Sequence, residues 1–327
     1  MKSIPRLRFA HLPTPVEPLP RLSAFLKGPS IMVKRDDQTG LALGGNKTRK
    51  LEFLIAEAQA NGARTLITAG SGQSNHCRQT AAAAARFGYS CILVLVGKPL
   101  EKEEKTLPSG NLLLNHLFGA KIVWTTRAER DLTLQQTFEK AWSDGRRPYL
   151  IPYGGSNSTG AVAYAFAMKE LLTQIHPDWI IFPSSSGGTQ AGLVLGAQIF
   201  GFKGNILGIS VDEPVNILQD RVATLVNSTS DLLGERINIS NKDIMVNADY
   251  LGDGYGIMGK PEQEAIRLFA MTEGLLLDPV YTGRAAAGMI DLIRNGFIKD
   301  DHTVLFWHTG GTPAIFADQY REKISGV

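Results

Sequence analysis

The chain has 327 residues, of which 43% are hydrophobic and 20% are charged; these proportions exclude a disordered chain and allow a large buried core. The net charge of +3 is small for this length, and no basic stretch is interleaved with aromatic residues, so we expect no nucleic-acid partner. With only two cysteines, no membrane-length apolar run and no signal-peptide core, we expect a cytoplasmic protein with reduced thiols, no metal site and no membrane contact.

Short, continuous apolar segments alternate with segments of helical length along most of the chain. Continuous hydrophobicity is typical of strands in a parallel sheet that helices cover on both faces, so the pattern predicts an α/β fold. Strands are expected at residues 65–69, 91–96, 121–125, 149–151, 179–183, 206–211 and 303–307. The clearest helices are expected at residues 74–87, 134–142, 160–172 and 261–272. Residues 98–105, rich in lysine and glutamate, are expected to form a solvated surface loop.

A lysine lies in a glycine-rich turn just ahead of a predicted helix. The turn is Gly-Gly-Asn-Lys at residues 44–47, and apolar residues then recur at helical spacing over residues 51–58. The positive potential of a helix entrance, with Arg49 and Lys50 nearby, disfavours the ammonium form of Lys47. A neutral lysine can hold an aldehyde cofactor as a Schiff base. The turn alone also suits a surface lysine, but the glycine–lysine pair of a phosphate-binding P-loop is absent.

A serine- and glycine-rich loop at residues 184–192 follows one predicted strand and precedes an apolar helix. Glycines there let backbone N–H groups close around an anion, and the helix N-terminus adds positive potential. The hydroxyls of Ser186 and Thr189 supply further donors. We interpret this loop as a phosphate-binding cradle, although a serine-rich helix cap would have the same local pattern.

Three further polar loops carry glycine, at residues 70–76, 278–283 and 308–311. Two of them directly follow predicted strands, and the carboxyl ends of strands are where open α/β sheets bind ligands. In the first loop, backbone N–H groups and the Ser74 hydroxyl suit a carboxylate, whereas His76 alone is more often structural than catalytic. Four such loops in one chain indicate a ligand site.

Together with Lys47, these loops make the chain similar to the fold-type II pyridoxal-phosphate enzymes. Within them it resembles the branch of 1-aminocyclopropane-1-carboxylate (ACC) deaminase and D-cysteine desulfhydrase. The likeness covers nearly the whole chain and is carried by residues 34–37, 44–52, 73–79, 185–192, 254–256, 278–283 and 308–311.

This resemblance implies pyridoxal 5'-phosphate as the cofactor and an α/β fold with two open, twisted, mostly parallel sheets covered by helices. It also implies a homodimer that acts on a small amino acid. Residues 1–48 and 160–327 would form a large cofactor-binding domain, and residues 49–159 a small domain inserted in it. The cofactor would lie in the cleft between the two.

The resemblance also implies a role for each residue of the cofactor site. The amine of Lys47 would hold the cofactor covalently, and Lys50 with the loop at residues 186–189 would hold its phosphate. Asn75 would bind the oxygen of the cofactor ring, and Thr282 would lie beside the pyridine nitrogen. The implied cofactor contacts are Lys47, Lys50, Asn75, Ser186, Gly187, Gly188, Thr189 and Thr282.

For the substrate, the resemblance implies that Ser74, Asn75 and His76 hold the carboxylate and that Ser74 is also placed for proton transfer. Tyr281 and Tyr255 would flank the reacting carbons from the other side. The implied catalytic residues are Lys47, Ser74, Tyr255 and Tyr281. The implied substrate contacts are Ser74, Asn75, His76 and Thr309.

Two positions separate the activities of this branch. The deaminase resembles this chain around Tyr281 but carries glutamate at the position of Thr282 and leucine at that of Thr309, whereas the desulfhydrase matches this chain at both. A carboxylate beside the pyridine nitrogen keeps it protonated and makes the ring a strong electron sink, as opening an unactivated cyclopropane demands. A threonine leaves the ring closer to neutral, which suffices when a thiolate departs.

We therefore expect α,β-elimination from D-cysteine, or from a related β-substituted amino acid, to sulfide, ammonia and pyruvate. One alternative is ACC deamination, in which the ring opens to 2-oxobutanoate and ammonia. Another is a non-catalytic pyridoxal-phosphate-binding protein, against which the joint presence of Lys47, Ser74, Tyr255 and Tyr281 argues.

Overall fold

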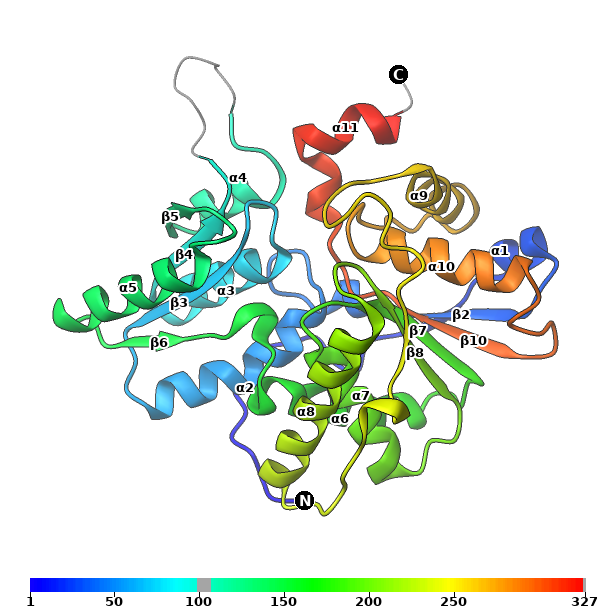
Figure 1. Ribbon diagram of the computed structural model, residues 1–327, viewed down its shortest axis with the longest axis horizontal. Coiled ribbons are helices and arrows are strands. Elements are labelled where there is room, and N and C mark those ends of the chain that lie inside the picture. Colours follow the sequence, from blue (N-terminus) through cyan, green and yellow to red (C-terminus); the bar gives the residue numbers. More distant parts are fainter. Residues whose placement is uncertain (99–106, 326–327) are drawn as a thin grey trace.

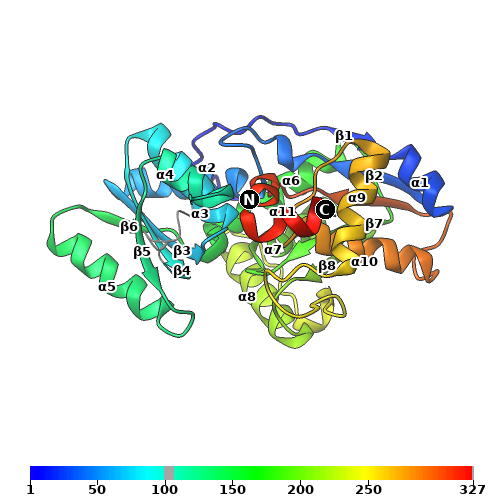
Figure 2. The ribbon, with the colours of Figure 1, turned by 90° about the horizontal axis from the view of Figure 1, so that it is seen from above.

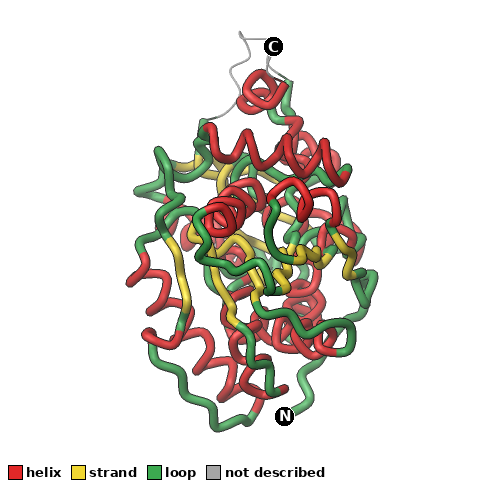
Figure 3. The backbone as a smooth tube through the Cα atoms, turned by 90° about the vertical axis from the view of Figure 1, so that its right-hand side faces the viewer, coloured by secondary structure: helices red, strands yellow, loops and turns green. Residues whose placement is uncertain are grey.

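The computed structural model describes residues 1–98 and 107–325, so nearly all of the charged loop expected at residues 98–105 lies outside the described part. Two separate sheets organise the described chain (Figure 1). The N-terminus and helix α11 (Asp318–Ser325) lie at opposite ends of the molecule (Figures 1 and 3). Within the described residues, no helix is long and apolar enough to span a membrane.

The larger sheet has six strands, which are parallel to their neighbours except for the antiparallel pair at one edge. Their spatial order is β1 (Val16–Pro18), β2 (Ser30–Lys34), β10 (Thr303–Trp307), β7 (Trp179–Ser184), β8 (Asn205–Ser210) and β9 (Met245–Asn247). The smaller sheet is entirely parallel, in the order β5 (Lys121–Thr125), β4 (Ser90–Val96), β3 (Thr65–Ser71) and β6 (Pro148–Leu150). All four of its strands lie inside residues 49–159, which we propose as the inserted small domain.

Helices cover both faces of each sheet, as Figures 1 and 2 show. On the larger sheet, one face packs against α1 (Pro20–Leu26), α9 (Lys260–Glu273) and α10 (Thr282–Arg294). The other face packs against α6 (Ser158–Leu172), α7 (Gly188–Phe200) and α8 (Val215–Leu233). On the smaller sheet, α2 (Asn46–Ala60), α3 (Asn75–Phe87) and α4 (Gly110–Leu117) lie on one face and α5 (Arg130–Ser143) on the other. The α/β fold with two mostly parallel sheets is therefore confirmed.

Helix α2 packs into the hydrophobic cores of both sheets. Leu51, Leu54 and Ile55 belong to the core under the smaller sheet, whereas Phe53 belongs to the core between the larger sheet and α6. The ring of Phe53 stacks on Phe166 of α6, with the ring centroids 6.1 Å apart. This helix therefore joins the two sheets through its side chains as well as through the backbone.

The strand bounds expected at residues 121–125 and 303–307 match the structure, but the apolar pattern does not predict β1, β2 or β9. Two of these missed strands have only three residues, and β2 ends in a lysine. The glycine-rich turn before α2 is also shorter than expected, because α2 begins at Asn46 and includes Lys47 in its first turn.

Candidate active site

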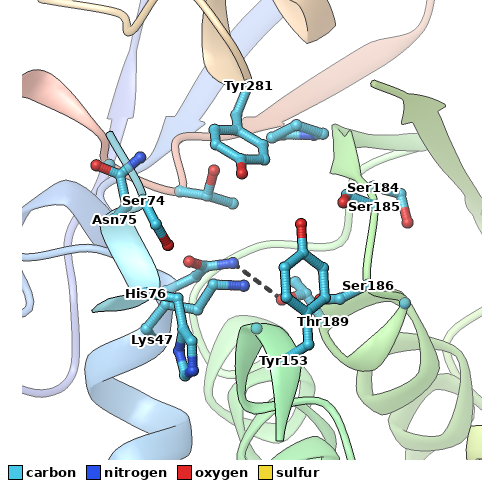
Figure 4. A pocket seen from close by; sticks show the side chains of 16 residues that line it. Lys47, Ser74, Asn75, His76, Tyr153, Ser184, Ser185, Ser186, Thr189 and Tyr281 are labelled. Carbon is cyan, nitrogen blue, oxygen red and sulfur yellow. Dashed lines mark hydrogen bonds between the residues drawn. The ribbon is translucent and has the colours of Figure 1, made fainter. Parts of the chain in front are cut away.

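A cavity lies among segments that follow strands of both sheets. Four of these segments come directly after β3, β6, β7 and β10, so the parallel topology brings distant stretches of sequence to one place. Figure 4 shows the side chains that surround it. The lining residues are Asn46, Lys47, Ser74, Asn75, His76, Tyr153, Gly154, Pro183, Ser184, Ser185, Ser186, Gly187, Thr189, Tyr281, Thr309 and Gly310.

Lys47 projects from the first turn of α2 into this cavity (Figure 4). Burial lowers the pKa of its amine to about 8, against a smaller opposing effect of the Asp212 charge. The sequence also predicts a lowered pKa for Lys47, but the cause in the structure is burial of the amine rather than the charge of neighbouring cations. Arg49 lies elsewhere, because its guanidinium hydrogen-bonds the carboxylates of Asp36 and Glu170. Removal of water from around the amine therefore makes the neutral form accessible at neutral pH.

The loop expected at residues 184–192 is shorter in the structure, because α7 begins at Gly188 and includes Thr189 in its first turn. Gly187 is the N-cap residue and has a φ of 83°, which favours glycine. Because the first N–H groups of a helix have no carbonyl partner within it, this end of α7 offers donors to an anion. A Cβ on Gly188 would lie 2.6 Å from Ser156 Oγ, so the backbone approaches its neighbour too closely for a side chain. Thr189 Oγ1 accepts a hydrogen bond from Asn46 Nδ2 at 3.0 Å.

Ser156 is a residue of this cradle that the sequence reasoning missed. Its hydroxyl is 2.7 Å from Ser186 Oγ and accepts hydrogen bonds from Gly188 N and Lys50 Nζ, both at 3.2 Å. The pKa of Lys50 is well below its ordinary value because of burial and the charge of Lys47. The Gly-Gly-Ser segment that contains Ser156 follows the strand expected at residues 149–151, so the same loop criterion could have found it.

Residues 74–76 lie at the start of α3, on the side of the cavity that faces the smaller sheet. Ser74 is the N-cap residue, and its hydroxyl accepts a hydrogen bond from Cys77 N at 3.2 Å. Asn75 Oδ1 accepts one from Asn111 Nδ2 at 2.8 Å. These bonds leave Ser74 and Asn75 held in fixed positions at the cavity wall.

His76 lines the cavity, but its ring lies below the Lys47 chain, on the far side from Tyr281 (Figure 4). The ring nitrogen Nε2 is 2.9 Å from Thr68 Oγ1, and Nδ1 is buried without a hydrogen-bond partner among the described residues. Burial and the charges of Lys47 and Lys50 hold the imidazole pKa well below its usual value. The neutral ring is therefore no cationic anchor for a substrate carboxylate.

Tyr281 and Tyr255 form a hydrogen-bonded pair, with their hydroxyl oxygens 2.6 Å apart. Tyr281 lines the cavity and points its hydroxyl toward the middle of it (Figure 4), whereas Tyr255 lines a second, adjoining cavity. The Tyr255 hydroxyl also lies 3.4 Å from Ser71 Oγ. Burial raises the pKa of both phenols, so each is neutral and able to donate a hydrogen bond at neutral pH.

The two threonines that distinguish this chain from the deaminase have different environments. Thr309 lines the cavity, whereas Thr282 is fully buried beside it in the first turn of α10. Thr282 Oγ1 donates to Asp278 Oδ1 at 2.7 Å, and the same carboxylate accepts the backbone N–H groups of Val280, Tyr281 and Thr282. Asp278 is therefore committed to the start of α10. Within residues 1–98 and 107–325, no aspartate or glutamate lines the cavity.

The described residues fit pyridoxal phosphate. A buried amine with a lowered pKa suits the aldehyde, and the start of α7 with Lys50 suits the phosphate. The Ser184 hydroxyl also lines the cavity and is buried without a hydrogen-bond partner in the described chain, as expected of a group that meets a ligand.

Comparisons with known proteins agree with this chemistry. Residues 7–310 match the family described as pyridoxal-phosphate dependent enzyme. A crystal structure titled as an ACC deaminase homologue is 34% identical, with a TM-score of 0.89, and the match covers 99% of this chain and 96% of that one. A fungal L-serine ammonia-lyase from Rhizomucor miehei shares the fold at 18% identity and a TM-score of 0.67, covering 97% of this chain and 100% of that one.

The processed form of threonine deaminase isoform 2 from Solanum lycopersicum also shares the fold, at 15% identity and a TM-score of 0.65, covering 96% of this chain and 82% of that one. The family match spans almost the whole chain, and the 34% identical relative is similar over nearly its full length. The protein is a member of the pyridoxal-phosphate-dependent enzyme family.

Proposed function

We propose that this enzyme catalyses α,β-elimination from D-cysteine, or from a related β-substituted amino acid, to give sulfide, ammonia and pyruvate. The observation that carries the proposal is the cavity wall, which has no carboxylate among the described residues. At the position where the deaminase carries glutamate, this chain has Thr282, bonded to a carboxylate that already caps α10. The pyridine nitrogen therefore lacks a charged partner that would keep it protonated. The cofactor ring would then be a weaker electron sink, which suffices when a good leaving group such as a thiolate departs.

Bound pyridoxal phosphate supplies an electron sink for the substrate's α-carbon. Lys47 would hold the cofactor, and its amine, which the lowered pKa keeps partly neutral, would accept the substrate's α-proton at Nζ. Ser74 and Asn75 hold the substrate carboxylate at the start of α3, and the α7 cradle with Lys50 holds the phosphate. Tyr281, paired with Tyr255, faces the reacting carbons as a neutral donor.

ACC deamination is the second candidate. It is supported by the 34% identical structure whose title names an ACC deaminase homologue. Tyr281, which both branches share, lines the cavity and does not separate them. Thr282 and Thr309 favour elimination, so the two activities differ in the residues around the cofactor ring rather than in the fold.

The remaining features of the proposal rest on the same resemblance. We propose a cytoplasmic homodimer, with a large domain of residues 1–48 and 160–327 and a small domain of residues 49–159. The cavity lies between loops from both of these segments, as expected of a site in a cleft between domains.

The test is an assay of the pure protein, loaded with pyridoxal phosphate, for sulfide and pyruvate from D-cysteine and for 2-oxobutanoate from ACC. L-cysteine and β-chloro-D-alanine complete the panel. We expect sulfide from D-cysteine, and none from a Lys47→Ala variant. Borohydride reduction followed by peptide mapping should place the cofactor on Lys47. Faster 2-oxobutanoate formation than sulfide formation would favour the deaminase, and no product from any substrate would favour a carrier protein.

A further inference from the structure

Next to the phosphate cradle, a serine in the cavity wall is hydrogen-bonded to an aspartate that lies behind that wall. Ser185 lines the cavity, and its hydroxyl donates a hydrogen bond to Asp212 Oδ2 at 2.7 Å. The other carboxylate oxygen of Asp212, Oδ1, is buried and has no hydrogen-bond partner within the described residues. A buried carboxylate oxygen without a partner is costly, so its presence beside a reaction site calls for a functional reason.

Asp212 lines the second cavity, which shares Tyr153 and Ser186 with the first. The exposed side chain of Arg127 lines this second cavity, so water reaches it. Ser185 thus faces the reaction cavity while Asp212 faces a solvent-supplied one. The hydrogen bond between them crosses the wall that separates the two.

Resting on the proposed elimination, we propose that Asp212 and Ser185 form a proton relay that protonates the leaving group. When the Cβ–S bond breaks, its electron pair leaves with sulfur, and Ser185 gives its hydroxyl proton to the thiolate. Ser185 recovers a proton from the Asp212 carboxyl group, which becomes the carboxylate that accepts the observed hydrogen bond. Water in the second cavity reprotonates Asp212. The α-proton is taken separately by Lys47, so every proton has a donor and an acceptor.

The electrostatic surroundings of Asp212 agree with this role. Burial raises the pKa of its carboxyl group, and the neighbouring Glu213 acts in the same direction. The hydrogen bond from Ser185 and the charges of Arg221 and Arg127 oppose the rise. The other titratable groups that interact with it are Lys47, Tyr153, Tyr255 and Tyr281.

The leaving group provides the decisive test, because chloride departs without a proton and a thiolate benefits from one. In Asp212→Asn, kcat/KM for sulfide release from D-cysteine should fall at least about a hundredfold, the lower end of what positioned proton donors contribute. For β-chloro-D-alanine it should stay within about twofold. Ser185→Ala should show the same split, so a folding defect in one variant does not decide the result.

Asp220→Asn is the matched control, because this acid also lines the second cavity but accepts its hydrogen bond from Asn241 Nδ2, at 2.6 Å, instead of from Ser185. It should retain both activities. An infrared titration provides a readout independent of turnover: the wild type should show a carboxyl band that titrates above the usual range of aspartate, and Asp212→Asn should lack it.

An equal loss on both substrates, or no loss on either, would overturn the relay while leaving the elimination reaction intact. If the infrared band persists in Asp212→Asn, the buried acid is another residue and the relay also fails. A wild-type enzyme that forms pyruvate from neither substrate would instead overturn the proposed function, and the relay with it.

Discussion

The basicity of one amine governs how this protein acquires its cofactor. Lys47 has a pKa of about 8 because it is buried, and a nucleophilic attack on an aldehyde requires its neutral form. The shift also affects stability. Because the folded-state pKa lies below the unfolded value of 10.5, the folded protein holds fewer protons between these two values, and Lys47 makes stability rise with pH in that window.

The rate at which pyridoxal phosphate attaches to the cofactor-free protein should therefore rise with pH and level off above about 8. Below that pH, the neutral fraction of the amine should increase about tenfold per pH unit. Stopped-flow absorbance measures this rate, and Lys47→Ala, which should show no attachment, is the control. A midpoint near the ordinary lysine value would mean that the reacting amine is not Lys47.

Two threonines should set the choice between elimination and ring opening. Converting Thr282 to glutamate and Thr309 to leucine should lower sulfide release from D-cysteine and raise any ACC opening. The new carboxylate would keep the pyridine nitrogen protonated, and the cavity would become less polar. The measurement is kcat/KM for both substrates in the wild type and the double variant.

Thr309→Leu alone is the control for pocket shape, since it leaves the charge near the ring unchanged. If the double variant and the single variant behave alike, the electronic explanation is wrong. A wild type that opens ACC faster than it releases sulfide would contradict the specificity proposal as a whole.

At the scale of elements, the site depends on how two helices begin. The start of α7 approaches Ser156 so closely that only glycine fits at Gly188, and the start of α2 is fixed by Arg49. The guanidinium of Arg49 contacts Asp36 of the η1 turn (Asp36–Gln38) and Glu170 of α6, with N···O distances of 2.8 and 2.9 Å. The position of the reactive amine therefore depends on a buried ion network two residues away.

Gly188→Val should weaken cofactor affinity at least tenfold, about 1.4 kcal/mol. The added side chain would displace Ser156 and open the cradle around the phosphate. Gln198→Val places the same side chain on the exposed face of α7 and should leave affinity unchanged. Equilibrium titration with pyridoxal phosphate measures both, and an unchanged affinity in Gly188→Val would mean that the loop only caps its helix.

Arg49→Met should lower the free energy of unfolding by about 3 to 5 kcal/mol, because it removes the guanidinium that pairs with the buried carboxylate of Asp36. Asp36 is fully buried. Arg294→Met, which removes the exposed pair with Glu264, should cost at most about 1 kcal/mol. Urea unfolding followed by circular dichroism compares the two, and similar effects would show that the buried network does not stabilise α2.

For the whole molecule, the sequence predicts the topology of the site better than its local contacts. Lys47, Ser186 and Tyr281 line one cavity, and Ser186 reaches it because its loop directly follows the parallel strand β7. The bond between Thr282 and Asp278 depends on how α10 begins, which apolar spacing does not reveal. Of the missed strands, β1 and β9 are three-residue edge strands, whereas β2 lies inside the sheet but begins with Ser30 and ends with Lys34, which interrupts its apolar pattern.

The cavity wall also contains residues that no motif identified. Tyr153 and Gly154 line the cavity although neither belongs to a predicted motif, and Ser156 lies 2.7 Å from Ser186 Oγ although 30 positions separate the two in the chain. His76, in contrast, belongs to a recognisable motif, yet its ring lies away from the open part of the cavity. In each example, packing between segments far apart in the sequence determines where the side chain lies, and the local spacing of residue types does not predict such packing.

Because α2 packs into two hydrophobic cores, changes in either core affect the active site. The aliphatic residues of α2 belong to one core and Phe53 to the other, so the reactive amine is anchored to both cores at once. Any rotation of one sheet relative to the other therefore tilts the helix that carries Lys47. Substitutions in either core, even far from the cofactor, therefore change the position of the Lys47 amine. The same core residues thus affect both thermal stability and turnover.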